Sequence, residues 1–340
     1  MKTSEPILNP APPRLVPTIV KGFDMVASHV HLILLPILLD LFLWLGPKLR
    51  IDQLLAPLWQ VVSENMLKIA SPDMLDTIMS VTILYTQMLE QVNLLSAIRT
   101  IPVGLPSLIA RIGVLASPLQ TPWEFQLSSY RIGIAIIGAL ILSGFFLGTI
   151  YFNSLARFSQ EEPGKLNWSI LAAQYAQVLI LFLILIALLI VFSIPLMLVT
   201  SALSLISSSL AQILVILVIF MGLWLVMPLV FSAHGIFVLD QKVVPSMLFS
   251  LRLVRFFLPG TSLFILITIM VSEGLNKIWT LPGTGSWLMG LGIAGHAFIV
   301  TALLAASFLY YRDGIKWMQF NIQRMNDSKQ EDGGNQVEHQ

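Results

Sequence analysis

The sequence predicts an all-α, polytopic transmembrane helix bundle of about six spans, with an amphipathic helical cap on the extracytoplasmic side. Of the 340 residues, 56% are hydrophobic and only 11% are charged, whereas soluble domains carry about 25% charged residues. Several uncharged apolar runs are about 20 residues long, which is the length that crosses a bilayer as a helix. Helices are expected because each one satisfies its own backbone hydrogen bonds inside lipid.

Six segments of the chain are expected to span the membrane. Four of them are predicted from hydropathy alone, because long uncharged apolar runs form them. The first span is shorter and contains Asp40, and the fifth is the weakest because it contains Ser272 and Glu273. The predicted spans are about 29–45, 132–152, 176–199, 210–232, 261–279 and 288–311.

The two ends of the chain differ from the apolar middle. Residues 1–18 are rich in proline and are expected to form an extended cytoplasmic tail. Residues 326–340 are polar and are expected to be disordered. Between them, 19–325 is expected to form a single membrane domain.

The distribution of Lys and Arg predicts the orientation of the chain. Cationic residues cluster in both tails and in the loops after the second and fourth spans, whereas the loop 200–209 carries none. Because cytoplasmic loops are enriched in Lys and Arg, both termini are predicted to be cytoplasmic. The expected location is the bacterial inner (plasma) membrane, which the chain crosses several times.

The segment 48–130 is long and apolar, yet it is predicted to lie outside the membrane on the outer face. Ser71 and Pro72 form a typical helix start, and apolar residues then recur at helical spacing for about 26 residues. An amphipathic stretch, 53–69, precedes this helix. The charges on these helices would cost about 2.5–3.5 kcal/mol each at the centre of a span, so a surface cap is favoured.

A further amphipathic helix is predicted on the cytoplasmic side at 244–257. Arg252 and Arg255 on this helix are candidate contacts for lipid phosphates. The alternative is an ordinary interfacial connector with no specific lipid contact. The predicted apolar stripe comprises Met247, Leu248, Leu251 and Val254.

Four ionisable residues lie within or beside the predicted spans, in the outer half of the bilayer: Asp40, Arg131, Glu273 and His296. An unpaired charge at that depth is expensive, so such groups usually face the bundle interior and pair. We expect Asp40 to pair with His296 or Arg131, with Glu273 nearby. One hypothesis is a small polar cavity that serves a substrate, an ion or a proton. The other is a structural clasp that fixes the order of the helices.

The familiar motifs of enzyme and cofactor chemistry give no site. The glycines of 290–295 match a dinucleotide fingerprint, but they begin a predicted span and follow no strand. Close packing explains them better, as it does Gly144 and Gly148. His29 and His31 lack the third ligand that a zinc site needs. We therefore expect no cofactor, no metal site and no enzymatic activity.

Five short stretches carry a resemblance to a known family. They are Gly22-Phe23-Asp24, 34–41, 104–108, 250–255 and 310–313. On these stretches the chain resembles a family of uncharacterised multi-spanning bacterial membrane proteins. More distantly, its second half is similar to the membrane domain joined to some glycerophosphodiester phosphodiesterases. The hydrolase part of those proteins has no counterpart in this sequence, so the resemblance implies a membrane fold and identifies no catalytic residue.

Two functional classes lead on the sequence alone, and a membrane-embedded enzyme comes third because no pair of groups has recognisable catalytic spacing. The first is a non-enzymatic membrane protein, which acts as a scaffold, binds a partner or organises lipids. The alternative is a transporter or permease subunit that uses the polar cluster of the outer half. Membrane lipids and another membrane protein are the expected partners. With a net charge of only +1, nucleic acid is not expected to be one.

Overall fold

The computed structural model describes residues 11–70, 72–112, 116–119, 123–160, 162 and 164–337. The chain forms two compact units. The first comprises Met1–Ser28, Asn153–Ile269 and Ala302–Gln340, and the second comprises His29–Phe152 and Met270–Thr301. Helices α6 (Tyr130–Phe158), α11 (Leu258–Trp279) and α12 (Met289–Val337) contribute residues to both units.

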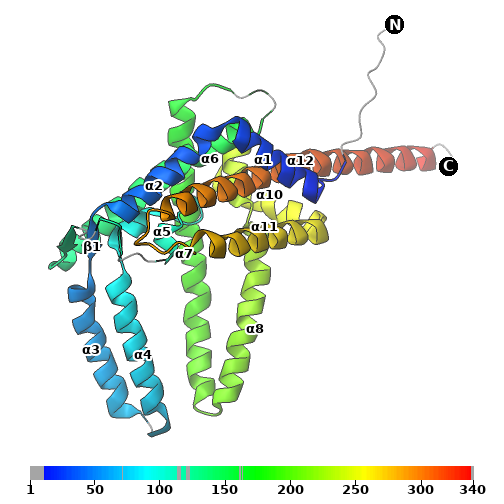
Figure 1. The fold of residues 1–340 in the computed structure, drawn as a ribbon. Coiled ribbons are helices and arrows are strands. Elements are labelled where there is room, and N and C mark those ends of the chain that lie inside the picture. The colour runs from blue at the N-terminus through cyan, green and yellow to red at the C-terminus, as the bar shows by residue number, and fades with distance from the viewer. Residues whose placement is uncertain are drawn as a thin grey trace. The chain divides into compact units, whose positions relative to one another are not determined.

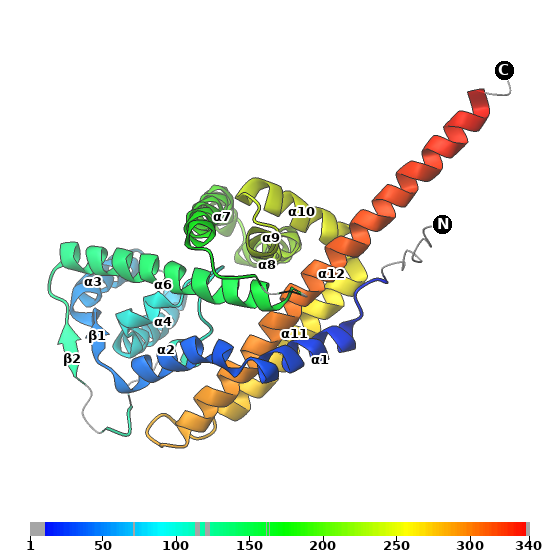
Figure 2. The same ribbon diagram turned by 90° about the horizontal axis from the view of Figure 1, so that it is seen from above.

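The described part of the first unit is built from helices. Besides its parts of α6, α11 and α12, the unit contains α1 (Leu15–Ser28), α7 (Trp168–Ser204), α8 (Ser208–Val226), the 3-10 helix η3 (Met227–Leu229), α9 (Ser232–Val238) and α10 (Val243–Phe256). Figure 2 shows α11 running alongside α12.

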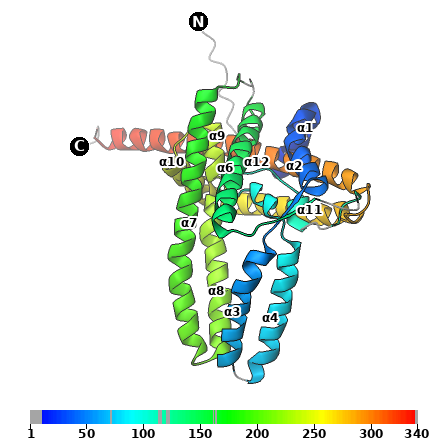
Figure 3. The same cartoon turned by 90° about the vertical axis from the view of Figure 1, so that its left-hand side faces the viewer.

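Helices α7 and α8 form a long hairpin (Figure 3). α7 begins after Asn167, whose side-chain oxygen accepts a hydrogen bond of 2.9 Å from the Ser169 N–H and so caps the helix. Large apolar side chains project from the hairpin and are exposed, for example Met197 at 72% and Phe220 at 70%. A hairpin with such a surface requires a lipid or protein environment, because water would face its apolar side chains.

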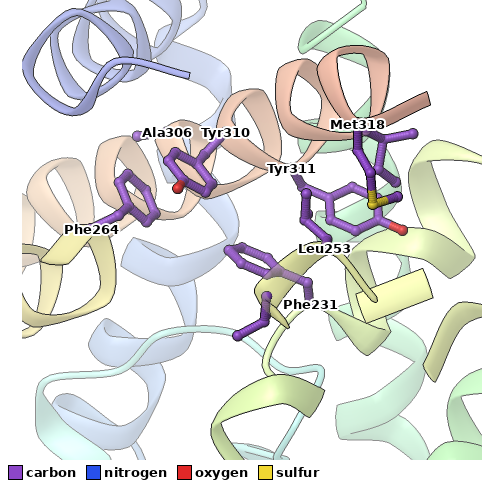
Figure 4. Packing of buried hydrophobic residues seen from close by; sticks show 9 residues of the cluster. Phe231, Leu253, Phe264, Ala306, Tyr310, Tyr311 and Met318 are labelled. Carbon is purple, nitrogen blue, oxygen red and sulfur yellow. The ribbon is translucent and has the colours of Figure 1, made fainter. Parts of the chain in front are cut away.

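A cluster of aromatic and aliphatic side chains forms the core of the first unit (Figure 4). The rings of Phe264 and Tyr310 stack with their centroids 4.3 Å apart. The Tyr310 hydroxyl lies 3.2 Å from the Thr261 hydroxyl, so its polar end has a partner inside the core. The buried members are Phe231, Leu253, Val254, Phe264, Ala306, Tyr310, Tyr311, Ile315 and Met318.

Helix α1 approaches α12 closely at a glycine. A Cβ atom on Gly22 would lie 2.5 Å from the Ala302 carbonyl oxygen and 2.7 Å from the Ala306 Cβ. No larger residue fits there without moving a helix, and the two alanines opposite are themselves small. This contact is the close approach through small residues that membrane helices use.

The second unit combines helices with one short parallel strand pair. In addition to its parts of α6, α11 and α12, it contains the 3-10 helix η1 (Val30–Ile33), α2 (Leu34–Leu45), β1 (Lys48–Arg50), α3 (Asp52–Ile69), α4 (Pro72–Gln91), the 3-10 helix η2 (Leu94–Ile98), α5 (Ile109–Ile112) and β2 (Glu124–Gln126). β1 pairs with β2 in parallel, with Lys48 opposite Glu124.

Helices α3 and α4 form a second hairpin (Figure 1). They occupy the positions where the sequence predicts two amphipathic helices. Trp59 and Tyr85 stack between them with ring centroids 4.1 Å apart. α4 ends at Gln91, earlier than predicted, because Asn93 starts η2 by accepting hydrogen bonds from the N–H groups of Leu95 and Leu49.

Lys48 closes the end of α2 from inside the unit. Its ammonium group is buried and donates to the carbonyl oxygens of Leu43 and, at 3.3 Å, Trp44. These carbonyls belong to the last turn of α2, where no helical N–H reaches them. Burial lowers the pKa of the Lys48 ammonium below its usual value, although the charge of Glu124 opposes this shift.

Two glycines of α6 face the segment 98–104. A Cβ atom on Gly144 would collide with the Ile98 carbonyl oxygen, and one on Gly148 would lie 2.7 Å from the Gly104 Cα. The packing role predicted for these glycines is therefore confirmed, but they admit the last residue of η2 and the loop that follows it, and not a second membrane helix. At 290–295, Gly292 and Gly295 likewise face Trp279 of α11.

The structure confirms an all-α architecture with several apolar helices long enough to cross a membrane. In the described ranges, five helices meet this criterion, and there are six if α1 and α2 are counted as one broken span. The first predicted span, 29–45, therefore counts as a span only if the bent pair of α1 and α2 is taken as one membrane crossing. α12 is helical as far as Val337, although we predicted disorder from Asn326. No proline follows Pro282 to interrupt it. Most of the proline-rich tail, residues 1–10, lies outside the described residues.

Candidate functional site

The carboxylate of Asp40, on α2, accepts hydrogen bonds from three donors. Its side chain is fully buried. The carboxylate oxygens accept hydrogen bonds from the Ser107 hydroxyl, from the Leu108 N–H at 3.0 Å and from the Ile109 N–H at 3.1 Å. Asp40 therefore caps the first turn of α5, although it comes from a different part of the chain.

The loop that carries Ser107 is fixed by its own contacts. The Thr100 hydroxyl donates to the Val103 carbonyl oxygen at 2.6 Å, and the Val103 side chain is fully buried. Gly104 lies against Gly148 of α6. The Ser107 hydroxyl, which donates to Asp40, accepts a bond of 3.0 Å from the Ala110 N–H. Contacts within the chain alone thus hold the donors to Asp40 in place.

Glu273 of α11 pairs with Arg111 of α5. The two guanidinium nitrogens of Arg111 meet the two carboxylate oxygens, with Nη1 to Oε1 at 2.7 Å. This bidentate contact raises the pKa of Arg111 above its usual value, with a smaller opposing effect of burial. Both side chains are exposed, at 40% and 48%, so the pair faces the surroundings of the unit and not its core.

Arg99 is the fourth charged residue of this region, after Asp40, Arg111 and Glu273, and it is half-buried. Burial and the charge of Arg111 lower its pKa, whereas Asp40 and Glu273 raise it. The charges of Asp40, Arg111 and Glu273 thus act on the Arg99 guanidinium. Because an arginine stays protonated in proteins, Arg99 and Arg111 together supply two positive charges against the two carboxylates.

His296 of α12 is buried and faces Asn276 of α11. Its Nδ1 lies 2.7 Å from the Asn276 side-chain oxygen, so this nitrogen carries the proton that is donated. Within the part of the chain that the structure describes, the His296 Nε2 and the Asn276 Nδ2 atoms have no hydrogen-bond partner. The charges of Arg99, Arg111 and Glu273 act on the His296 ring.

The structure brings together three of the four predicted cluster residues and changes how they pair. Asp40, Glu273 and His296 all lie near Arg99 or Arg111. Asp40 meets the 107–109 loop, which differs from the predicted contact with His296 or Arg131. Arg131 is exposed at the start of α6, and no described ion pair includes it. The side chains that sequence reasoning missed are Arg99, Ser107, Arg111 and Asn276.

On α10, Arg252 and Arg255 are exposed, as candidate lipid contacts must be. Arg252 lies over the Phe249 ring at 6.0 Å from its centroid. The predicted apolar stripe is only partly correct. Val254 is buried, but Leu248 is exposed and Leu253 is buried in its place. The helix is rotated so that Ser246 and Ser250 face the interior, where the Ser250 hydroxyl donates to the Pro228 carbonyl oxygen at 2.5 Å.

Separating Arg111 from Glu273 is expected to change stability only slightly. A double-mutant cycle with Arg111→Ala and Glu273→Ala should give a coupling energy below about 1 kcal/mol, because both side chains are exposed. The measurement is chemical unfolding of the purified protein in detergent. A coupling several times larger would show that the pair is shielded from water by lipid or by a partner.

The arrangement brings two guanidinium groups, two carboxylates and one imidazole into one region of the second unit. In the ranges that the structure describes, no three His, Asp or Glu residues gather as metal ligands would. The contacts are those of a polar clasp that joins α2, α5, α11 and α12. Comparisons of the chain with family models, with curated proteins and with solved structures find no match.

Proposed function

We propose that the protein is a non-enzymatic membrane scaffold that binds a protein partner through its α3–α4 hairpin. The observation that carries this proposal is the surface of that hairpin. It lies outside the candidate spans, yet it exposes a series of large apolar side chains. Among them are Leu58 at 52%, Val61 at 58%, Met79 at 57%, Ile83 at 60% and Met88 at 59%. Extended exposed apolar patches mark interaction sites.

The charge of the hairpin supports a protein partner over a lipid surface. By sequence, the two helices carry five acidic residues against one basic residue, Lys68. The acidic residues are Asp52, Glu64, Asp73, Asp76 and Glu90. Helices that lie on membranes carry Lys and Arg on their polar face, because the lipid surface is anionic. An acidic hairpin is repelled by such a surface. It fits a protein whose contact face is apolar with neutral or basic edges.

The satisfied state of Asp40 supports the same proposal. A carboxylate that serves a substrate, an ion or a proton keeps an approach open for it. The Asp40 oxygens instead accept three hydrogen bonds from within the chain, and the side chain has no exposed surface. This is the behaviour of a residue that fixes helices in place.

Site-specific photo-crosslinking in cells that produce the full chain tests the proposal. A photoreactive residue at Met79 or Ile83, one helical turn apart on α4, should crosslink one defined protein. The same residue at Thr77, which is exposed on the side of α4 away from Met79 and Ile83, is the matched control and should give little product. A second copy of this chain as the crosslinked protein would identify self-association. Crosslinks to lipid alone from Met79 and Ile83 would contradict a protein partner.

A transporter or permease subunit is the second candidate, and Arg99 favours it. This arginine is half-buried beside Asp40, Arg111 and Glu273, and no hydrogen bond or ion pair from its guanidinium is among those described. A cation placed in this way can receive an anion or steer a proton. Proton or anion flux into liposomes that contain the protein would support transport if Arg99→Gln abolished the flux and Lys68→Gln did not. Flux equal to that of empty liposomes would exclude transport of protons or anions and would favour the scaffold function.

A further inference from the structure

A cavity of about 300 Å³ lies between the start of α1 and α12, within the first unit. Its lining comes from residues 11–21 on one side and from Asp313 and Lys316 on the other. The volume is at the lower end of the range of about 300–1,000 Å³ for small-ligand sites. Gly22, one residue beyond the lining, packs α1 closely against α12 beside the cavity.

The lining of this cavity, which we call the α1–α12 cavity, is positively charged. Arg14 and Lys21 contribute from the α1 side and Lys316 from α12. The acidic residue among the described lining is Asp313, and Arg312 binds its carboxylate at 2.8 Å through Nε and at 2.7 Å through Nη2. Since Arg312 compensates Asp313 from outside the lining, the cavity keeps an excess of positive charge.

The first turn of α1 adds to the attraction for an anion. Thr18 directs both its N–H, at 3.1 Å, and its hydroxyl, at 2.6 Å, to the Arg14 carbonyl oxygen. The preceding N–H groups of Leu15 and Val16 lie in the first turn, where no helical carbonyl accepts them. The positive end of the α1 dipole therefore lies at the same place as the cationic side chains.

The position of the cavity along α12 matches the level of lipid headgroups. The apolar run of α12 ends at Tyr311, and the charged residues Arg312 and Asp313 follow directly. On α1, Val16 and Val20 are exposed at 68% and 50%, on a helix whose cationic side chains line the cavity. A helix with exposed apolar residues and Lys or Arg beside them is typical of the membrane interface.

We propose that the α1–α12 cavity binds a phosphate group, and that anionic phospholipid supplies it. Arg and Lys side chains that converge at a helix start are the groups that bind phosphate in proteins. Inorganic phosphate carries the same chemistry, but the depth of the cavity along α12 favours a headgroup whose acyl chains lie beside Val16 and Val20. The site does not depend on the partner proposed for the α3–α4 hairpin, which belongs to the second unit.

Binding of dioctanoyl phosphatidylglycerol to the purified full-length protein in detergent, measured by native mass spectrometry, tests this site. Each cation near a lipid phosphate contributes about a fivefold gain in affinity. Arg14→Gln with Lys21→Gln is therefore expected to weaken binding by about 25-fold. Lys165→Gln, which removes an exposed charge outside the cavity, is the control and should have no effect. Lys21→Arg should retain binding.

Two further probes distinguish the sources of the phosphate. Dioctanoyl phosphatidylcholine carries the same phosphate with no net charge, and it should bind at least severalfold more weakly than phosphatidylglycerol. Inorganic phosphate should bind weakly and compete only at high concentration. Inorganic phosphate that binds as tightly as the lipid would assign the site to free phosphate and overturn the lipid source. Wild type and the Arg14→Gln, Lys21→Gln variant should have the same size-exclusion profile and melting temperature. Equal lipid binding by the two proteins would then overturn the site itself.

Discussion

Replacing Asp40 by alanine is expected to lower the free energy of unfolding by about 3–4 kcal/mol, the largest effect of a single change in the second unit. The substitution removes a buried acceptor and leaves the Ser107 hydroxyl and the N–H groups of Leu108 and Ile109 without a partner. Unmet buried donors cost about 1–3 kcal/mol each, partly offset by relaxation of the loop. Chemical unfolding in detergent, followed by circular dichroism, measures the difference.

The variant Asp40→Asn distinguishes the contribution of the hydrogen bonds from that of the side-chain volume, because asparagine has nearly the same size as aspartate. Asp40→Asn keeps one oxygen acceptor but turns an NH₂ group toward donors, so a loss of about 2 kcal/mol is expected. Asp76→Asn, at an exposed position of α4, is the control and should change stability by less than about 0.5 kcal/mol. A loss below 1 kcal/mol for Asp40→Ala would show that the 107–109 loop is not anchored by this carboxylate.

Replacing Gly148 by alanine is expected to destabilise the second unit by about 1–2 kcal/mol. The added Cβ would lie 2.7 Å from the Gly104 Cα and 2.9 Å from both the Gly104 nitrogen and the Val103 carbonyl oxygen. All three are backbone atoms, so no side chain can move aside to make room. The overpacking penalty of about 1–3 kcal/mol exceeds the gain of about 1 kcal/mol that alanine brings to a helix.

The same helix offers a matched control. A Cβ atom on Gly138 would meet no atom within 4 Å, so Gly138→Ala should raise stability by up to about 1 kcal/mol through helix propensity alone. The two alanine variants of α6 are thus expected to shift the unfolding midpoint in opposite directions. If Gly148→Ala and Gly138→Ala shifted the unfolding midpoint equally, the contact of Gly148 with residues 103–104 would not be tight enough to exclude a Cβ atom.

Hydropathy predicted the spans because span formation is a local property. Twenty consecutive apolar side chains decide it, whatever the rest of the chain does. The role of Asp40 as a structural residue was likewise one of the two hypotheses. Its partners were not predicted, since two of the three donors are backbone N–H groups. Every residue except proline carries such a group, so the sequence does not indicate which of them binds Asp40.

The charged partners were missed for a different reason. Arg99 and Arg111 fall in the segment that the sequence assigns to the outer cap. A charge there costs no free energy of burial in lipid, so its position in the sequence does not indicate a polar site. α5, which holds Arg111, is only four residues long and has no periodicity to reveal it. The glycines of α6 showed that something approaches that helix closely, but the spacing of small residues does not distinguish a loop from a helix.

The contact between Asp40 and Ser107 also has a consequence for how the protein is made. The two residues are 67 positions apart, so a ribosome that adds about 5–20 residues per second needs roughly 3–13 s to produce Ser107 after Asp40. Until then the Asp40 carboxylate on α2 lacks the three donors that it meets in the folded chain. The buried contacts of the first span are therefore expected to be complete only after the 99–109 segment has been synthesised.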